Sequence, residues 1–204
     1  MMRHSLRILL PLVVLLVGSA SGGIADETGP ESFAGKLLVA DKSMLDPRFA
    51  QTVIYLVRHD EKGAFGLIVN KPLVKIPLAD LLRQLDVEGT ETQAELDLYF
   101  GGPVQGELGF VLHSRDFAAA KATATVQGGY AVSDVRQVLR AISEQKGPEK
   151  ALFAVGYAGW AAKQLDAELE RGDWSVVDAD EDLVFDLPVS EKWPAARDRR
   201  SLKL

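Results

Sequence analysis

The sequence predicts a single domain of the mixed α+β class. Short apolar runs typical of strands alternate irregularly with amphipathic segments typical of helices, without the repeated strand–helix–strand units of a doubly wound sheet. With 204 residues, of which 47% are apolar and 25% charged, the chain has the composition of one ordinary globular domain. We therefore expect one hydrophobic core.

The first 25 residues have the features of a secretory signal. Arg3 and Arg7 precede a ten-residue apolar run, 8–17, and small residues follow, so that a signal peptidase would cut after Ala20 or Ala25. The alternative, an uncleaved membrane anchor, needs about 20 apolar residues. We expect residues 1–25 to be removed and the mature protein to be periplasmic or otherwise exported, without stable membrane insertion. Residues 26–34 are then a polar linker before a domain that spans residues 35–193.

The first strands of that domain are expected at 36–40, 52–58 and 65–69, three short apolar runs bounded by turn residues. A helix is predicted over 77–85, because proline is tolerated in the first turn and four leucines share one face. The strand-like run that ends at 69 stops on Asn-Lys-Pro, which we expect to leave the sheet.

Two further strands are expected at 96–100 and 108–113, joined by the loop GGPVQGE, whose glycines permit positive φ. Ser133 is a good N-cap for a helix that ends before Gly147-Pro148.

A buried strand, 151–155, is predicted to lead through GYAG into a second helix that starts near Trp160 and ends at Gly172. Strands at 174–177 and 183–185 follow, and residues 194–204 form a basic tail.

Composition limits the chemistry of the mature protein. Removal of the signal takes away two of 23 basic side chains and none of 29 acidic ones, which leaves a net charge of −8. The absence of cysteine excludes disulfides, thiol nucleophiles and thiolate metal sites. Only His59 and His113 follow the signal, so metal ligands and general bases are few. We expect no metal and no cofactor.

The histidines and the GYAG segment each allow a functional and a structural interpretation. His59-Asp60 at a strand end is either an acid–base pair or a polar strand terminus, and His113-Ser114 lacks the surrounding pattern of a nucleophile elbow. A helix start near Trp160 would present backbone N–H groups to an anion, whereas Tyr157 and Trp160 are also suited to a core. The structural interpretation is favoured in each case.

Nucleic acid is not an expected partner. Nine acidic side chains lie between residues 166 and 186, where Arg171 is the single basic one, and such a surface repels phosphates. The basic cluster of the tail is short, and no helix-turn-helix pattern is present.

Four segments, in order, resemble the YqgE/AlgH family, also called UPF0301 or DUF179. They are GKLLVADKSMLDPRFAQTVIYLVRHDEKGAFGLIVNKPL, LYFGGPVQGELGFVLHS, LFAVGYAGWAAKQLDAEL and GDWSVVDADEDLVFD. The resemblance implies a bent, bifurcated sheet that forms a pseudo-barrel flanked by helices. Members are often labelled transcriptional regulators, but no catalytic residue set transfers to this chain. Positions that match the family motifs form the candidate binding surface: His59, Asn70, Lys71, Gly101, Gly102, Pro103, His113, Tyr157, Trp160 and Gln164.

Two departures from the family pattern stand in one segment, where Lys163 replaces the usual glycine and Asp166 replaces a glutamate. The favoured hypothesis is a non-enzymatic binding module that is exported to the cell envelope and recognises a protein or small ligand. A hydrolase using His59 or His113 is the second hypothesis, and it requires both histidines and a carboxylate to converge in one pocket. A transcriptional regulator is the third, and the acidic charge and the signal oppose it.

Overall fold

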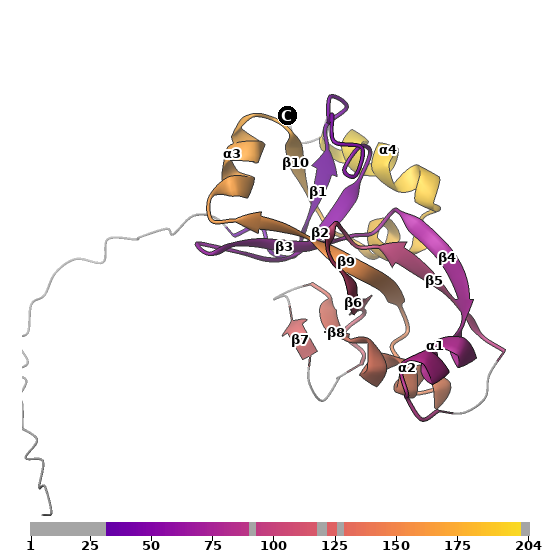
Figure 1. Ribbon diagram of the computed structural model, residues 1–204. Helices are drawn as coiled ribbons and strands as arrows, with labels where there is room; N and C mark the ends of the chain where they lie inside the picture. The colour runs from indigo at the N-terminus through magenta and orange to yellow at the C-terminus, as the bar shows by residue number, and fades with distance from the viewer. Residues whose placement is uncertain (1–31, 90–92, 118–121, 126–128, 201–204) are drawn as a thin grey trace, which may run out of the picture.

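The computed structural model describes residues 32–89, 93–117, 122–125 and 129–200. Ten strands of these residues form one branched hydrogen-bonded network, and helices lie around it (Figure 1). The strands are β1 (Lys36–Ala40), β2 (Val53–Asp60), β3 (Gly63–Ile68), β4 (Pro72–Pro77), β5 (Glu95–Phe100), β6 (Val104–His113), β7 (Ala122–Thr125), β8 (Ala131–Asp134), β9 (Ala151–Ala161) and β10 (Trp174–Asp178). The helices are α1 (Leu78–Gln84), α2 (Val135–Ser143), α3 (Gln164–Glu170), the π-helix η1 (Asp182–Asp186) and α4 (Val189–Arg200).

The sheet branches at β9. The main path runs β10-β1-β2-β3-β9-β6-β8-β7, and a side branch leaves through β5 to β4. The second half of β9 pairs with β3 over Ala158–Ala161, whereas its first half pairs in parallel with β5 over Phe153–Val155. Gly156 lies between the two halves with a φ of +68°, a conformation that glycine adopts without steric penalty. The mixed α+β fold and the bifurcated sheet are thus confirmed.

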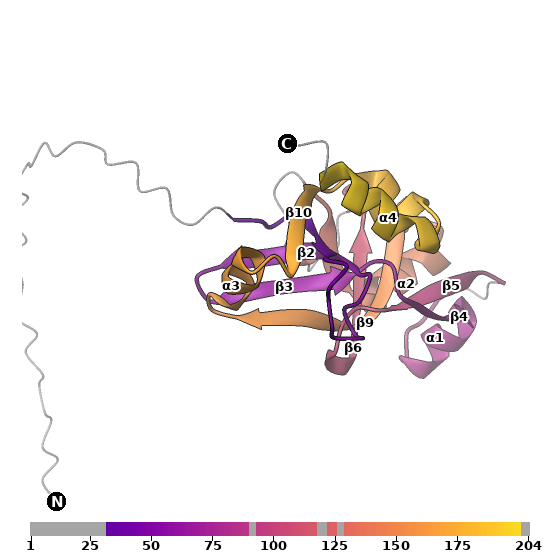
Figure 2. The ribbon, with the colours of Figure 1, turned by 90° about the horizontal axis from the view of Figure 1, so that it is seen from above.

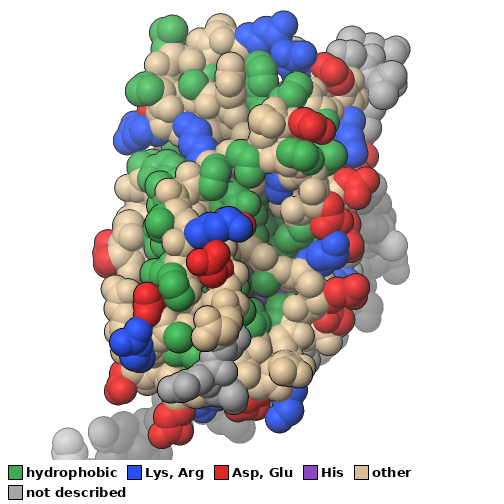
Figure 3. All heavy atoms as spheres, turned by 90° about the vertical axis from the view of Figure 1, so that its right-hand side faces the viewer, with side chains coloured by type: hydrophobic (Ala, Val, Ile, Leu, Met, Phe, Trp, Pro, Cys, Tyr) green, Lys and Arg blue, Asp and Glu red, His purple; other side chains and the backbone are tan. Residues whose placement is uncertain are grey.

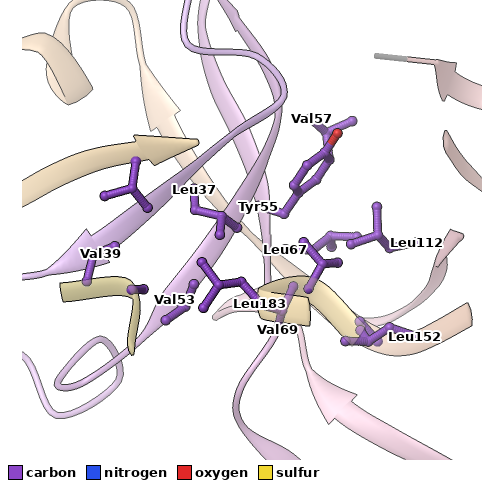
Figure 4. Close-up of a cluster of buried hydrophobic side chains, with 14 of the residues drawn as sticks. Leu37, Val39, Val53, Tyr55, Val57, Leu67, Val69, Leu112, Leu152 and Leu183 are labelled. Atoms are coloured by element: carbon purple, nitrogen blue, oxygen red, sulfur yellow. The ribbon is translucent and has the colours of Figure 1, made fainter. Parts of the chain in front are cut away.

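Strand β2 is buried on both faces, which explains its continuous apolar sequence. Val53, Tyr55 and Val57 point into one cluster, together with Leu183 of η1, and Figure 4 shows these side chains meeting between the strands. Ile54 and Leu56 point to the opposite face and join a second cluster. A strand with two apolar faces is therefore at the centre of the domain.

The helices cover different parts of this sheet (Figures 1 and 2). α4 packs on β10, β1 and β2, and α3 packs on β9, β10 and β3. α1 and α2 contact each other and, with β5 and β9 side chains such as Leu98 and Phe153, form a third cluster. The two ends of β9 therefore face different helical surroundings.

Several predicted elements need correction. The predicted strand 183–185 is the π-helix η1, and the helix predicted near Trp160 begins only at Gln164 because β9 continues through the GYAGW segment to pair with β3. Ser133 lies in β8, and Asp134 is the N-cap of α2 instead, with its carboxylate accepting from the Arg136 N–H at 2.9 Å. The chain also does not leave the sheet after Asn70-Lys71, because Pro72 begins β4.

The segment predicted as a basic tail is largely helical, since α4 extends to Arg200. Trp193 of α4 donates its indole N–H to the Ala40 carbonyl at 2.9 Å, and Arg199 pairs with Asp180. The predicted signal lies outside the described residues. Within the described ranges, no helix is long and apolar enough to cross a membrane.

Candidate functional site

The glycines of the family motifs bring two backbones together at the branch of the sheet. Gly101 donates its N–H to the Val155 carbonyl at 2.9 Å. A Cβ added to Gly102 would lie 2.1 Å from the Tyr157 carbonyl carbon, and one on Gly156 would lie 2.3 Å from the Gly102 oxygen. Both distances are far inside van der Waals contact. These three glycines are therefore required by the close approach of β9 to the segment before β6.

Asn70 is buried near the branch of the sheet and bonds backbone groups there. Its side chain is 8% exposed, accepts the Val53 N–H at 2.8 Å and donates to the Gln51 carbonyl at 2.8 Å. Lys71 lies beside it and donates to the carbonyls of Pro47 and Arg48, at 3.1 and 2.8 Å, and burial lowers the pKa of its ammonium. The Asn-Lys pair thus ties the end of β3 to the loop before β2.

Tyr157 belongs to an aromatic cluster on the face of the sheet, with ring centroids 4.8 Å from Phe65 and 6.0 Å from Phe110. Pro103, which follows Gly102 in the chain, is exposed. Asn70, Gly102 and Tyr157 therefore lie near one branch point, held there mainly by backbone contacts and buried atoms.

His113 is fully buried at the opposite end of β9. Its Nδ1 lies 2.7 Å from the Ser114 carbonyl, which only accepts, so Nδ1 carries the proton and Nε2 accepts from the Ser133 hydroxyl at 2.8 Å. Both ring nitrogens are therefore used within the core.

His59 lies at the end of β2 beside α3 and is 9% exposed. The Phe33 N–H donates to Nδ1 at 3.3 Å, which places the proton of the neutral ring on Nε2, and Nε2 lies 3.3 Å from an Asp166 carboxylate oxygen. The Phe33 ring stacks on the imidazole with centroids 5.3 Å apart. His59 is therefore fixed on both sides and faces a carboxylate of α3.

Sequence analysis did not identify Glu168, which connects the motif residues around α3. One of its carboxylate oxygens accepts the indole N–H groups of Trp160 at 2.8 Å and Trp174 at 2.9 Å. The other accepts from the Gln164 amide at 2.9 Å, one helical turn earlier. The sequence does contain an indication of this contact, because Gln164 and Glu168 are four residues apart and therefore lie on the same face of the helix.

A pocket of about 780 Å³ opens beside this arrangement and is called the α3 pocket below. It is lined by His59, Asp60, Glu61, Lys163, Asp166, Ala167 and Glu170. Lys163 precedes α3 with a φ of +61°, a left-handed conformation that disfavours a side chain. That conformation suits the glycine that the resemblance leads us to expect at this position, and Lys163 places an ammonium at the pocket.

The two histidines lie at opposite ends of β9. His113 of β6 pairs with Ala151 at the start of β9. His59 of β2 pairs with Ala64 of β3, which in turn pairs with Trp160 near the end of β9. Nine positions of strand at about 3.3 Å each correspond to a path of about 30 Å along β9, and His113 is not among the residues that line the α3 pocket. The convergence required by the hydrolase hypothesis is therefore not observed. Within the described part of the chain, no three histidine or acidic side chains are placed to hold a metal ion.

Comparison with known proteins places the chain in one family. Residues 37–204 match the family described as DUF179, AlgH-like. A UPF0301 protein of Jannaschia sp. (strain CCS1) is 43% identical over 79% of this chain and 85% of its own length, and one of Caulobacter vibrioides is 43% identical over 85% and 89%.

Solved structures agree with this assignment. The solution structure of the AlgH protein from Pseudomonas aeruginosa, 42% identical, gives a TM-score of 0.70 and covers 85% of this chain and 92% of that one. A crystal structure of a Corynebacterium diphtheriae protein, 25% identical, gives 0.58 over 84% and 88%. The chain therefore belongs to the AlgH-like family of UPF0301 proteins.

Proposed function

We propose that the chain is a non-enzymatic binding module, exported to the cell envelope, that receives a small ligand or a partner's side chain in the α3 pocket. The observation that carries the proposal is the pocket itself, about 780 Å³ beside a fixed His59. This volume lies in the range of about 300–1,000 Å³ that is usual for small-molecule sites. Three motif residues, His59, Trp160 and Gln164, come together in and next to its wall.

The charge of the wall favours a ligand with a positive group. Four carboxylates and one ammonium line the pocket, and the imidazole of His59 has both ring nitrogens occupied. Among the described residues, Glu61 and Glu170 have no ionic partner, so a cation in the pocket meets carboxylates that are not already neutralised. Lys163 on the same wall offsets part of this negative charge, and the pocket stays acidic overall.

Binding is tested by NMR titration of the mature chain, residues 26–204, with free arginine and with acetate as probes. Arginine is expected to shift the backbone amides of α3 and His59, and acetate alone is expected to leave them in place. Glu170→Gln should weaken arginine binding about threefold, whereas Glu107→Gln, on an exposed part of β6 away from the pocket, should have no effect. If acetate shifted these amides as much as arginine does, or if arginine shifted amides elsewhere in the protein, the α3 pocket would not be the binding site.

Export is tested by the N-terminal mass of the protein recovered from fractionated source cells. A chain that begins at Ser21 or Asp26 in the envelope fraction supports export. An intact Met1 in the cytosol would overturn it, and an intact N-terminus in the membrane fraction would mean anchoring.

A further inference from the structure

A groove of about 360 Å³ opens where β5 and β9 separate, far along the sheet from the α3 pocket. β5 pairs with β4 from Glu95 to Tyr99, but with β9 only from Leu98 to Phe100. Residues Glu95–Asp97 therefore have a strand on one edge and the groove on the other. Across the groove, Ala151 and Leu152 of β9 pair with β6 on their far edge.

Side chains from both layers of the domain line this groove. Leu96, Ile142 and Phe153 belong to the cluster under α1 and α2. Tyr99, Leu152 and Phe185 belong to the cluster beside η1 and α4. The groove therefore lies beside the part of the β5 edge that β9 does not pair with, and side chains from both faces of the sheet line it. Since side chains of a strand alternate between faces, an extended segment there would contact both clusters.

The margin of the groove is acidic. Glu95 and Glu149 are exposed and have no ionic partner among the described residues, and Asp97 has Lys75 at 3.8 Å. The neighbouring Lys150 is held by Asp186 at 2.5 Å. Figure 3 shows this side of the molecule, where hydrophobic side chains line a hollow and both acidic and basic side chains lie around it. The residues that line the groove itself include three acidic side chains and no basic one. An occupant with apolar and basic side chains complements this surface.

We infer that the groove receives an extended segment of a partner protein, which carries apolar residues and at least one Lys or Arg and adds as a strand next to β5. Main-chain hydrogen bonds to a free strand edge give such a segment its affinity, and the pockets for alternate side chains give its specificity. The chain's own linker is not complementary, because residues 26–31 carry Asp26, Glu27 and Glu31 and no basic residue. The volume suits a contact of a few residues.

The test uses the mature chain and three fluorescein-labelled hexapeptides. The first is Lys-Val-Ile-Lys-Val-Thr, the second has glutamate in place of both lysines, and in the third proline replaces isoleucine and removes a backbone donor. Fluorescence anisotropy should show binding of the basic peptide at least tenfold tighter than that of either counterpart. In NMR spectra, the basic peptide should shift the amides of Glu95–Asp97, Ala151 and Leu152.

Variants separate this groove from the rest of the surface. Glu95→Gln and Glu149→Gln should each weaken the basic peptide about threefold, and Glu107→Gln should leave it unchanged. The inference is overturned if the three peptides bind equally, or if the shifts lie outside the groove. It is also overturned if deletion of residues 201–204 shifts the groove amides of the free protein, since the chain's own end then occupies it. Failure here would leave binding at the α3 pocket unaffected.

Discussion

Replacing Lys192 by methionine is expected to remove a pH dependence from the stability of the fold. Lys192 of α4 is 1% exposed, and its ammonium donates to the Val184 carbonyl at 2.6 Å. Burial lowers its pKa to about 8 from 10.5, although Asp186 partly opposes the shift. Since one pKa unit corresponds to about 1.4 kcal/mol, keeping this charge in the fold at pH 7 costs about 3 kcal/mol.

The sign follows from the direction of the shift. Between pH 8 and 10.5 the unfolded chain binds more protons at Lys192 than the folded one, so the free energy of unfolding rises with pH across this window and is level below it. From pH 7 to 9.5 the contribution of Lys192 is expected to rise by about 2 kcal/mol. Lys192→Met also loses the bond to Val184, about 1 kcal/mol. The part of that bond that depends on the charge of Lys192 is already contained in the folded-state pKa, so it adds no further pH dependence.

The assay is urea unfolding of the wild type, Lys192→Met and the control Lys42→Met at pH 7 and 9.5. Lys42 is exposed in the loop after β1. The difference in unfolding free energy between wild type and Lys192→Met should change by about 2 kcal/mol between the two pH values, and the difference for Lys42→Met should stay constant. An unchanged difference for Lys192→Met would refute the reasoning, because Lys192 would then titrate alike in the folded and unfolded chains.

Three further substitutions test the construction of the branch and of the α3 region. Gly102→Ala should destabilise the fold by about 3 kcal/mol or more, because its Cβ meets the Tyr157 backbone, while Gly106→Ala, with nothing within 4 Å, should change urea unfolding by less than about 0.5 kcal/mol. Asn70→Ala should lower the unfolding free energy by about 2 kcal/mol, since the buried Val53 N–H and the Gln51 carbonyl lose their hydrogen-bond partner. An unchanged unfolding free energy would show that these two hydrogen bonds do not stabilise the fold. Glu168→Ala should lower the unfolding free energy by about 3 kcal/mol and alter tryptophan fluorescence, because two indole N–H groups lose their acceptor. Glu168→Gln should lower the unfolding free energy by a smaller amount, since its amide oxygen still accepts hydrogen bonds.

The hydrophobic pattern of a segment was sufficient to predict those strands and helices whose conformation depends mainly on their own residues. The apolar runs of β1 and β2 and the leucine face of α1 were predicted to within a few residues, because their burial follows directly from periodicity. The end of β9 was not predicted, because the two glycines of Gly156–Gly159 are typical of a turn, and pairing with β3 keeps the segment from Ala158 onward extended. Residues 183–185 have a strand-like composition, yet they form a π-helix that contacts α4 and places Leu183 in the core. In both cases tertiary contacts decide the conformation.

The site was predicted only as a set of motif positions, since periodicity carries no information on which loops meet. The set divides in space. Gly101, Gly102 and Asn70 build the branch, and His113 is a buried core residue. His59, Trp160 and Gln164 come together around α3, where Glu168 joins two of them. Sequence alone treats all of these positions as one surface.

This division also locates the difference between this chain and its family. The branch residues must have the same geometry whatever the protein binds, so they are expected in any member with this fold. Lys163 and Asp166, the two positions at which the sequence resemblance leads us to expect other residues, both line the α3 pocket. A binding difference between this chain and its relatives should therefore arise there.

A double variant, Lys163→Gly with Asp166→Glu, restores the family pattern in this chain and tests that argument. Loss of the ammonium makes the pocket more negative, so arginine should bind about threefold more tightly in NMR titration. Glycine also relieves the left-handed conformation at φ +61°, so the unfolding free energy should rise by about 0.5 kcal/mol or more, because the relief exceeds the entropy that glycine loses on folding. Lys42→Gly, in the exposed loop after β1, controls for the loss of a surface charge alone. Unchanged arginine affinity alongside increased stability would mean that Lys163 alters the backbone at this position and not the ligand preference of the pocket.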